Sequence, residues 1–213
     1  MGDLLQRGRT CNAGSRLVVD RSVKDDVLAR VAEINASFVV GDPLDPGTTM
    51  GAIVDDSQLR RVLGYLDVGV REGGTVTGGR RVRESSGGFF VEPAVIDGVP
   101  NTARFAQEEI YRPVLTVVEF EGVEEGLRIA NQTAFGLAAS VWTADLSTAH
   151  RVARRLRAGT VWVNTFDATD VFAPFGGFGS SGSGRDKSLH ALAEYTGLKT
   201  TWISTQPRAD RRR

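Results

Sequence analysis

The fold is decided by the run Val114-Leu115-Thr116-Val117-Val118-Glu119-Phe120, which is apolar almost throughout. Such a run is typical of a strand that a parallel sheet buries on both faces. Before and after it, segments with strand-like and helix-like spacing alternate. Strands are predicted at 15–19, 75–77, 138–143, 160–163 and 198–204, and helices at 22–34, 57–72, 123–131, 147–156 and 187–195.

This alternation predicts an α/β domain with a largely parallel sheet whose faces are covered by helices. We expect functional loops at the carboxyl ends of the strands. Ser22 stands where a helix N-cap is expected. Residues 89–96 are apolar but contain Pro93, so they suit an edge strand or an irregular extended segment.

Composition limits the classes of function. The 213 residues carry 26 Lys and Arg against 26 Asp and Glu, so no overall charge attracts nucleic acid or an anionic membrane. The single cysteine excludes an internal disulfide, and no apolar run approaches the roughly 18 residues of a membrane helix. We expect a soluble, cytoplasmic protein without a metal site, since His, Cys and carboxylate residues do not cluster.

That cysteine lies in Gly8-Arg9-Thr10-Cys11-Asn12-Ala13-Gly14. Small residues and glycines around a lone thiol let a substrate and backbone N–H groups approach it, so Cys11 is a candidate nucleophile. The alternative is a buried, unreactive thiol, because free cysteine often behaves as a small apolar side chain.

A resemblance to a known family rests on four ordered blocks. They are the Cys11 stretch, Gln107-Glu108-Glu109-Ile110-Tyr111-Arg112-Pro113-Val114, residues 131–159 with Phe135-Gly136-Leu137-Ala138-Ala139 inside, and Pro174-Phe175-Gly176-Gly177-Phe178 followed by Ser181-Gly182-Ser183-Gly184-Arg185. One glycine-rich loop alone indicates only a turn. Together, the blocks resemble the aldehyde dehydrogenase superfamily over nearly the whole chain.

The resemblance implies an oxidoreductase that converts an aldehyde to a carboxylic acid. Cys11 would attack the aldehyde carbon to form a thiohemiacetal and then a thioester, with NAD or NADP as cofactor. Glu109 would accept hydrogen bonds from the nicotinamide ribose, Tyr111 would pack near the nicotinamide, and Phe175 would line the substrate tunnel. Arg112 stands where the resemblance has a glycine, which would distort the ribose clamp if the position needs a positive φ.

The substrate is expected to be a small aldehyde. Residues 185–192 and 199–204 look most like the branch that oxidises γ-glutamyl-aminobutyraldehyde and related aminoaldehydes. Asn164 ends a predicted strand, and Asp167 and Asp170 follow it, where the resemblance places the substrate entrance. The two carboxylates could attract a cationic group there, or they could be ordinary solvated loop residues.

We predict a truncated catalytic domain at 1–195, an oligomerisation strand at 196–205 and a disordered basic tail at 206–213, with the family's NAD-binding domain absent. A homo-oligomer is expected, and a separate chain carrying the missing domain is a candidate partner. By itself this chain should then be a poor enzyme. The alternative is a non-catalytic remnant that serves as a subunit-pairing module.

Overall fold

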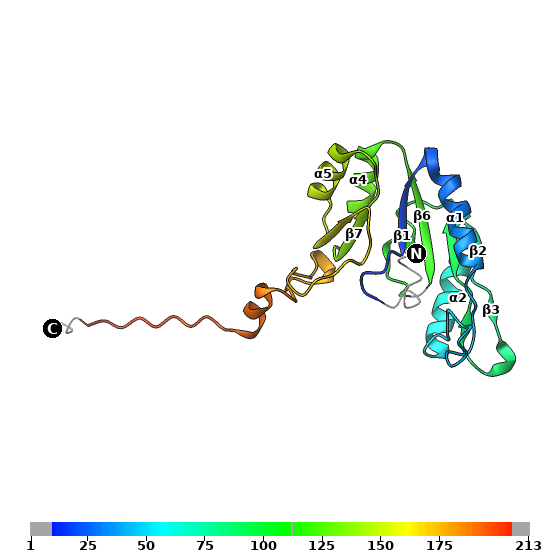
Figure 1. The fold of residues 1–213 in the computed structure, drawn as a ribbon, viewed down its shortest axis with the longest axis horizontal. Helices are drawn as coiled ribbons and strands as arrows, with labels where there is room; N and C mark the ends of the chain where they lie inside the picture. The colour runs from blue at the N-terminus through cyan, green and yellow to red at the C-terminus, as the bar shows by residue number, and fades with distance from the viewer. Residues whose placement is uncertain (1–9, 112, 206–213) are drawn as a thin grey trace, which may run out of the picture.

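A computed structural model describes residues 10–111 and 113–205 (Figure 1). Its strands are β1 (Arg16–Asp20), β2 (Thr75–Gly78), β3 (Arg81–Val82), β4 (Phe90–Val91), β5 (Ala94–Asp97), β6 (Val114–Phe120), β7 (Ala138–Val141) and β8 (Thr160–Val163). Its α-helices are α1 (Lys24–Ala36), α2 (Asp56–Arg71), α3 (Arg104–Gln107), α4 (Val123–Asn131) and α5 (Leu146–Arg155). Its 3-10 turns are η2 (Arg21–Val23), η3 (Glu84–Ser86), η4 (Gly179–Ser181) and η5 (Leu189–Tyr195).

The main sheet has the strand order β1-β6-β5-β2. β1 and β5 run parallel to β6, with Arg16 opposite Thr116 and Ala94 opposite Val114, and only β2 is antiparallel. β6 is an interior strand whose two faces are both packed, with Val118 in the main core and Val117 in the second cluster, and this burial explains its apolar sequence. The predicted α/β fold with a largely parallel sheet is confirmed.

The segment 89–96 does not form an edge strand. It divides into β4, which pairs with β3 in a separate ribbon, and β5, which lies between β6 and β2. Pro93 is tolerated because it stands just before β5, where no ladder donor is needed, and its carbonyl still accepts from Gly79 N–H at 3.2 Å. Both predicted alternatives for this segment, an edge strand and an irregular extended segment, were therefore wrong for β5, which is an interior strand.

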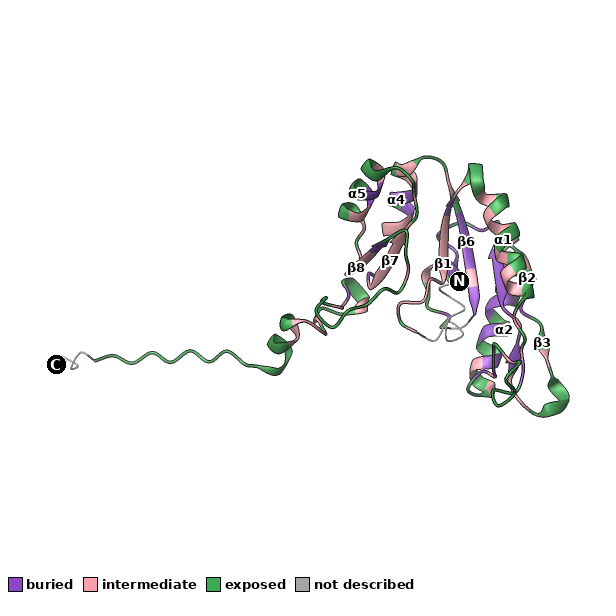
Figure 2. Ribbon diagram, viewed as in Figure 1, coloured by how far each residue is buried: buried purple, intermediate pink, exposed green. Residues whose placement is uncertain are grey.

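Helices cover the two faces of the sheet unequally. α2 packs Leu59, Val62 and Leu66 into the main core with Ile96, all of them buried. On the other face, α1 contributes only partly buried side chains against Val19 and Val117. Figure 2 shows this difference, with buried residues around β6 and α2 and mostly exposed or intermediate residues on α1.

Aspartates cap the N-termini of two α-helices, α2 and α5. Asp55 accepts from Gln58 N–H at 2.8 Å at the start of α2, and Asp145 accepts from Thr148 N–H at 2.9 Å at the start of α5. Ser22 was predicted as an N-cap, but it lies inside η2. The cap there is Asp20, whose carboxylate accepts from the backbone N–H and the hydroxyl of Ser22.

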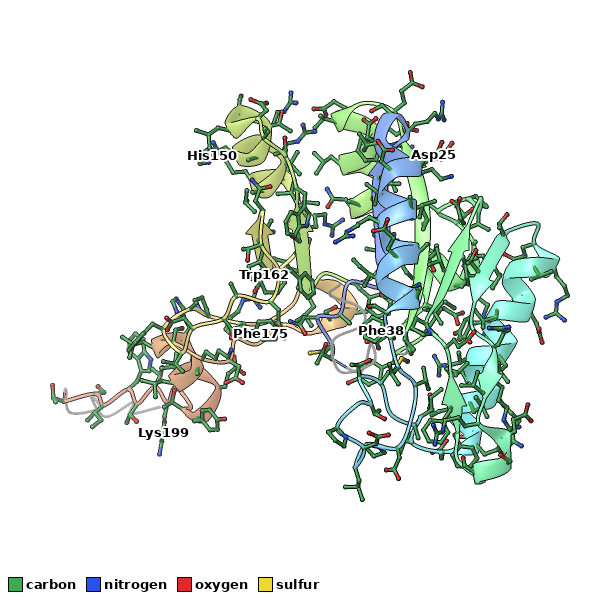
Figure 3. All side chains as sticks on the ribbon, turned by 45° about the vertical axis from the view of Figure 1, so that its right-hand side comes forward. Asp25, Phe38, His150, Trp162, Phe175 and Lys199 are labelled. Carbon is green, nitrogen blue, oxygen red and sulfur yellow. The ribbon has the colours of Figure 1, made fainter. Side chains whose placement is uncertain are left out.

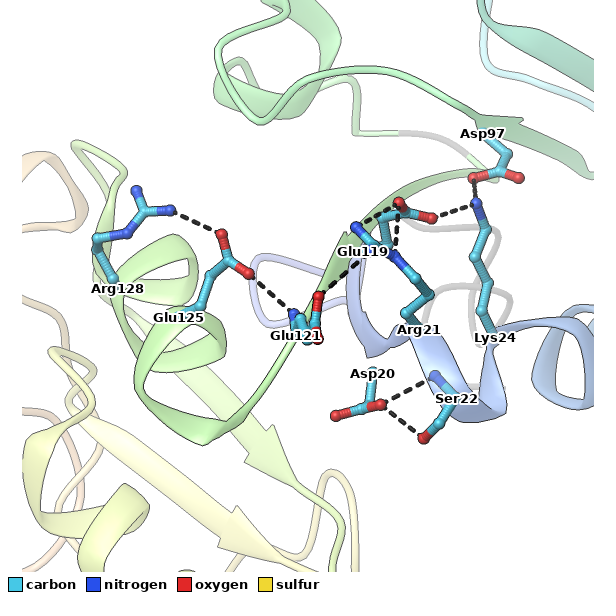
Figure 4. Close-up of polar contacts among 9 residues, drawn as sticks. All are labelled: Asp20, Arg21, Ser22, Lys24, Asp97, Glu119, Glu121, Glu125 and Arg128. Atoms are coloured by element: carbon cyan, nitrogen blue, oxygen red, sulfur yellow. Dashed lines mark hydrogen bonds and ion pairs between the residues drawn. The ribbon is translucent and has the colours of Figure 1, made fainter.

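A cluster of charged residues lies at the carboxyl end of the main sheet (Figure 4). Lys24 Nζ is 2.9 Å from Asp97 and 3.1 Å from Glu119, so it links α1 to β5 and β6. Burial acts to lower the pKa of Lys24, but its hydrogen bonds to Asp97 and Glu119 hold that pKa above its usual value. The same interaction with Lys24 lowers the pKa of Glu119.

β7 and β8 form a separate parallel pair, with Ser140 opposite Trp162. The pair is joined to the main sheet through its helices, because Arg155 of α5 binds Glu124 of α4 at 2.9 Å. Among the described residues, no helix is long and apolar enough to cross a bilayer.

The segment 196–205 is extended and exposed, and it pairs with no other strand in the described part of this chain. Figure 1 shows it leading away from the rest of the molecule. The helix expected before it is the 3-10 turn η5. The oligomerisation strand stays a prediction, and the basic tail, Arg112 and residues 1–9 lie outside the described residues.

Candidate active site

Cys11 is exposed and lies in a tight turn just before β1. Ala13 N–H donates to Thr10 O at 3.0 Å, and Ser15 N–H donates to Ala13 O at 2.9 Å. The thiol is therefore not a buried core side chain, which was the alternative left open by the sequence. An exposed thiol in a fixed backbone turn can be reached by a small electrophile.

Glu109 and Tyr111 approach the same end of the sheet as Cys11. Thr116 lies opposite Arg16, and its N–H donates to Ser15 O at 2.9 Å, so the segments leading into β1 and β6 enter side by side. Both segments precede the amino ends of their strands, whereas Asn164 and the residues after it follow the carboxyl end of β8. The parallel pairing of β1 with β6 brings the two entering segments together.

Glu109 is exposed, and its backbone carbonyl accepts from Arg61 Nη2 at 2.8 Å. Tyr111 is 41% exposed and has a φ of 62°, in the left-handed region that tyrosine rarely adopts. The sequence raised positive φ as a concern for Arg112, which lies outside the described residues. The positive φ that the structure describes here belongs to Tyr111, the residue before Arg112.

Glu108 has a different environment from Glu109. It accepts from Tyr65 Oη at 2.5 Å and from Arg104 Nε at 2.9 Å, and these hydrogen bonds, that of Arg104 first, lower the pKa of its carboxyl. Burial and the bond to Glu108 raise the pKa of Tyr65. The Glu108 carboxylate thus links α2 to α3, while the carboxylate of Glu109 faces solvent.

A polar network that the sequence did not reveal supports these segments. Arg16 Nη1 donates to Asn101 Oδ1 at 2.9 Å, Arg16 Nη2 donates to Ala130 O at 2.8 Å, and Gln107 Nε2 donates to Gln132 O at 3.0 Å. Asn101 is buried, and burial lowers the pKa of Arg16. Only Gln107, inside the second family block, gave any sequence signal for it.

The residues after β8 reach the cysteine turn. Asn12 Nδ2 donates to Asp167 Oδ1 at 2.5 Å, and the Phe166 ring lies next to Gly14. Asp167 therefore contacts the residue that follows Cys11 in the chain, and its place at a substrate entrance stays a prediction. Asp170 instead accepts from Phe172 N–H at 2.9 Å, and no described contact joins it to the Cys11 turn.

Asn164 lies at the end of β8 and has both side-chain amide atoms engaged. Its Oδ1 accepts from Thr143 N–H and its Nδ2 donates to Thr143 O, each at 2.9 Å. The side chain therefore fixes the turn after β8 and is not directed to a substrate by any described contact.

Phe175 begins the glycine-rich loop and is half-buried. Its backbone N–H and C=O pair with Asp186, and Lys187 Nζ lies 5.6 Å from its ring centroid. Figure 3 places Phe175 below Trp162 on the β7–β8 side of the chain, with Phe38 on the side of α1. A shallow hollow of about 310 Å³ beside Phe175 is lined by Arg185, Glu194 and Tyr195, and no described contact joins it to the Cys11 turn.

The structure thus combines an exposed thiol in a turn with an α/β scaffold of largely parallel strands. Residues 1–201 match the model of the aldehyde dehydrogenase family, and this chain belongs to that family.

Relatives of this chain include two named aldehyde dehydrogenases. It is 43% identical over 208 residues to betaine aldehyde dehydrogenase from Mesorhizobium japonicum, covering 96% of this chain and 43% of that protein. It is 41% identical to the NADP/NAD-dependent aldehyde dehydrogenase PuuC of Escherichia coli, covering 96% of this chain and 41% of that protein.

Among solved structures, γ-glutamyl-γ-aminobutyraldehyde dehydrogenase from Burkholderia cenocepacia superposes with a TM-score of 0.87 at 55% identity, covering 92% of this chain and 40% of that chain. This chain thus spans about two fifths of the length of the relatives it matches.

Proposed function

We propose that this chain provides the cysteine nucleophile and the aldehyde-binding surface of an aldehyde dehydrogenase that uses NAD or NADP. One observation carries the proposal: the pairing of β1 with β6 brings the exposed Cys11 turn and the Glu109–Tyr111 segment to the same end of the sheet. A nucleophile and a cofactor-holding carboxylate are needed at one place for this chemistry.

The reaction begins when the Cys11 thiolate adds to the aldehyde carbon, forming a C–S bond and a thiohemiacetal oxyanion. The backbone N–H of Cys11 stabilises that oxyanion. NAD or NADP, when bound, supplies the acceptor for the hydride that leaves the same carbon. The resulting thioester on Cys11 is hydrolysed by water, which releases the carboxylic acid and restores the thiol.

Glu109 and Tyr111 fit the role of holding the cofactor. An exposed carboxylate can accept hydrogen bonds from two ribose hydroxyls, and the Arg61 contact to the Glu109 carbonyl holds the backbone from which that carboxylate projects. The exposed ring of Tyr111 offers an apolar surface for the nicotinamide.

The substrate is proposed to be an aminoaldehyde. Support comes from the relative whose name specifies γ-glutamyl-γ-aminobutyraldehyde and from the two exposed aspartates after β8. Asp170 would attract the cationic end of such a substrate, and Phe175 would line its path.

The chain spans about two fifths of its relatives, and we propose that these 213 residues need the segment that the relatives have in addition for full activity. The test is NADH or NADPH formation from an aminoaldehyde by the purified 213-residue chain, alone and mixed with the complementary segment of a relative. Cys11→Ala is the control. Activity that Cys11→Ala abolishes supports the proposal, and activity that survives this substitution contradicts it.

A second function is favoured by the exposed segment 196–205, whose apolar Trp202 and Ile203 have no cover in the described chain. In this alternative the chain is a non-catalytic subunit-pairing module that forms homo-oligomers. The two functions separate experimentally, since pairing needs this segment and does not need Cys11.

A further inference from the structure

The segment that follows β8 is fixed to the strands beneath it. Asn164 is bonded to the Thr143 backbone through both amide atoms, and Ser140 Oγ donates to Thr165 O at 2.7 Å. Trp162 Nε1 donates to Ala168 O at 2.8 Å. The Phe166 ring packs on Trp162 with centroids 5.3 Å apart. Residues 164–168 therefore form a rigid platform, anchored from β7 and β8.

Backbone conformation directs one side chain of this platform toward the cysteine turn. Asn164 has a φ of 52° and Asp167 a φ of 57°, so both lie in the left-handed region. Asn and Asp enter this region more readily than other non-glycine residues, which explains why these two types occupy the positions. Local strain of this kind persists where surrounding contacts over-determine the backbone, as the platform contacts do here.

The cysteine turn is tied to the platform by a side-chain hydrogen bond. Within the turn, the described backbone bonds are local, from Ala13 to Thr10 and from Ser15 to Ala13. Asn12, adjacent to Cys11, reaches across 155 residues of sequence to the carboxylate of Asp167. An amide donor on an ionised acceptor forms a stronger bond than a neutral pair does.

We propose that Asn12 and Asp167 form a clasp that holds the Cys11 turn against the platform and so fixes the direction of the thiol. Both are positioning residues: they act through the backbone of the turn, and neither needs to touch the substrate. This inference rests on the proposed role of Cys11. It gives Asp167 a task different from attracting a cationic substrate.

The experiment exchanges the two partners. Asn12→Asp places two carboxylates against each other and breaks the clasp, and Asp167→Asn places two amides there. The double variant Asn12→Asp with Asp167→Asn restores an amide–carboxylate pair in the opposite sense. Asparagine tolerates the positive φ at residue 167, so the exchange leaves the platform backbone unstrained.

Two readouts use the complete chain. Because Cys11 is the only cysteine, the rate of its alkylation by iodoacetamide reports on this thiol alone. Hydrogen exchange of the peptide spanning residues 10–15 reports on the turn. Asn12→Asp should raise turn exchange and change the alkylation rate by at least about threefold, and the double variant should return both to near wild-type values. Asp67→Asn, an exposed charge-matched change on α2, should alter neither.

The clasp is overturned if Asn12→Asp leaves both readouts at wild-type values, or if the exchanged pair behaves like the single variant. Asn12→Ser, which removes the amide without adding charge, gives the same test if Asn12→Asp fails to fold. Neither readout requires aldehyde oxidation. A failed clasp therefore leaves the Cys11→Ala activity test standing, and a silent activity assay leaves the clasp test standing.

Discussion

Arg16 and Asn101 are joined by a 2.9 Å hydrogen bond between the guanidinium Nη1 and the amide Oδ1, although 85 residues separate them. The bond connects the start of β1 to the loop before α3, which leads in turn to Glu109. Through it, the strand that follows the nucleophile turn and the segment proposed to hold the cofactor share one buried polar network.

Arg16→Leu should lower the free energy of unfolding by about 2 kcal/mol. The substitution leaves the buried Asn101 Oδ1 and the Ala130 carbonyl without the guanidinium donor. A buried acceptor that has lost its donor costs more free energy than an ordinary hydrogen bond contributes. Urea denaturation followed by circular dichroism measures the change. Arg60→Leu is the matched control, since Arg60 is exposed and its ion pair with Asp56 lies on its own helix, so its loss should cost under about 0.5 kcal/mol. Equal effects of the two variants would contradict the buried network.

Tyr65→Phe should cost about 1 kcal/mol of stability, because the ring stays buried while its hydroxyl no longer donates to Glu108. It should also raise the pKa of the Glu108 carboxyl, since one of the bonds that lower it is removed, while the bond from Arg104 remains. The pKa is followed by NMR titration of Glu108, with Arg104→Lys as a comparison that keeps the charge. A Glu108 titration identical to wild type in Tyr65→Phe would exclude the hydrogen bond.

Most secondary structure was predictable because its signals are local. The apolar run of β6 and the amphipathic spacing of α2 each reflect neighbours within one element, and both predictions are confirmed. The prediction for β5 relied on Pro93 and was wrong. A proline lacks a backbone N–H only at its own position, and β5 begins one residue later. Ser22 misled the capping prediction because Asp20, two residues earlier, is the better acceptor.

The candidate site was predictable by residue type but not by arrangement. The family blocks pointed to Cys11 and Glu109, and Asp167 was selected by its place after a predicted strand. Nothing local reveals that Asn12 meets Asp167, since that contact depends on how β8 lies relative to β1. The same applies to Arg16 and Asn101, whose residue types are unremarkable outside the fold. Such contacts depend on which strands pair and on the conformation of the loops, and local patterns in a single sequence reveal neither.

Stability should depend on pH through the Lys24 cluster. The pKa of Glu119 is lowered from 4.5, so its contribution is present above pH 4.5 and is lost as the pH falls through the lower folded-state value. The pKa of Lys24 is raised from 10.5, so its contribution is complete below pH 10.5 and is lost as the pH rises through the higher folded-state value. Urea denaturation across pH 3 to 11 measures both limbs.

Lys24→Met should flatten both limbs of that pH profile, because it removes the charge that stabilises Glu119 and Asp97 as well as the lysine itself. Arg30→Met, on the same helix but pairing with the exposed Glu33, serves as the control and should leave the shape of the profile unchanged. An unchanged profile in Lys24→Met would mean that the cluster in Figure 4 does not persist in solution.

Two glycines should respond in opposite directions to the same substitution. A Cβ at Gly159, just before β8, would lie 1.7 Å from the carbonyl oxygen of Gly176, so Gly159→Ala must push the glycine-rich loop away from the strand. The expected cost is at least about 2 kcal/mol, since backbone cannot yield as a side chain can. Gly64 lies in α2 with nothing within 4 Å of its Cβ position, and Gly64→Ala should stabilise the chain by about 0.5 to 1 kcal/mol.

This pair of variants also separates two roles of the loop that carries Phe175. If the glycines only make turns, alanine at Gly159 is tolerated, since its φ is not in the positive range. If they permit close packing, Gly159→Ala destabilises the chain and displaces Phe175, whose loop is anchored through Gly176 and the Asp186 pairing. Thermal unfolding compared across wild type, Gly64→Ala and Gly159→Ala decides between them. A destabilising Gly64→Ala would instead show that α2 is not packed as described, because an exposed helical glycine gains from alanine when the helix is intact.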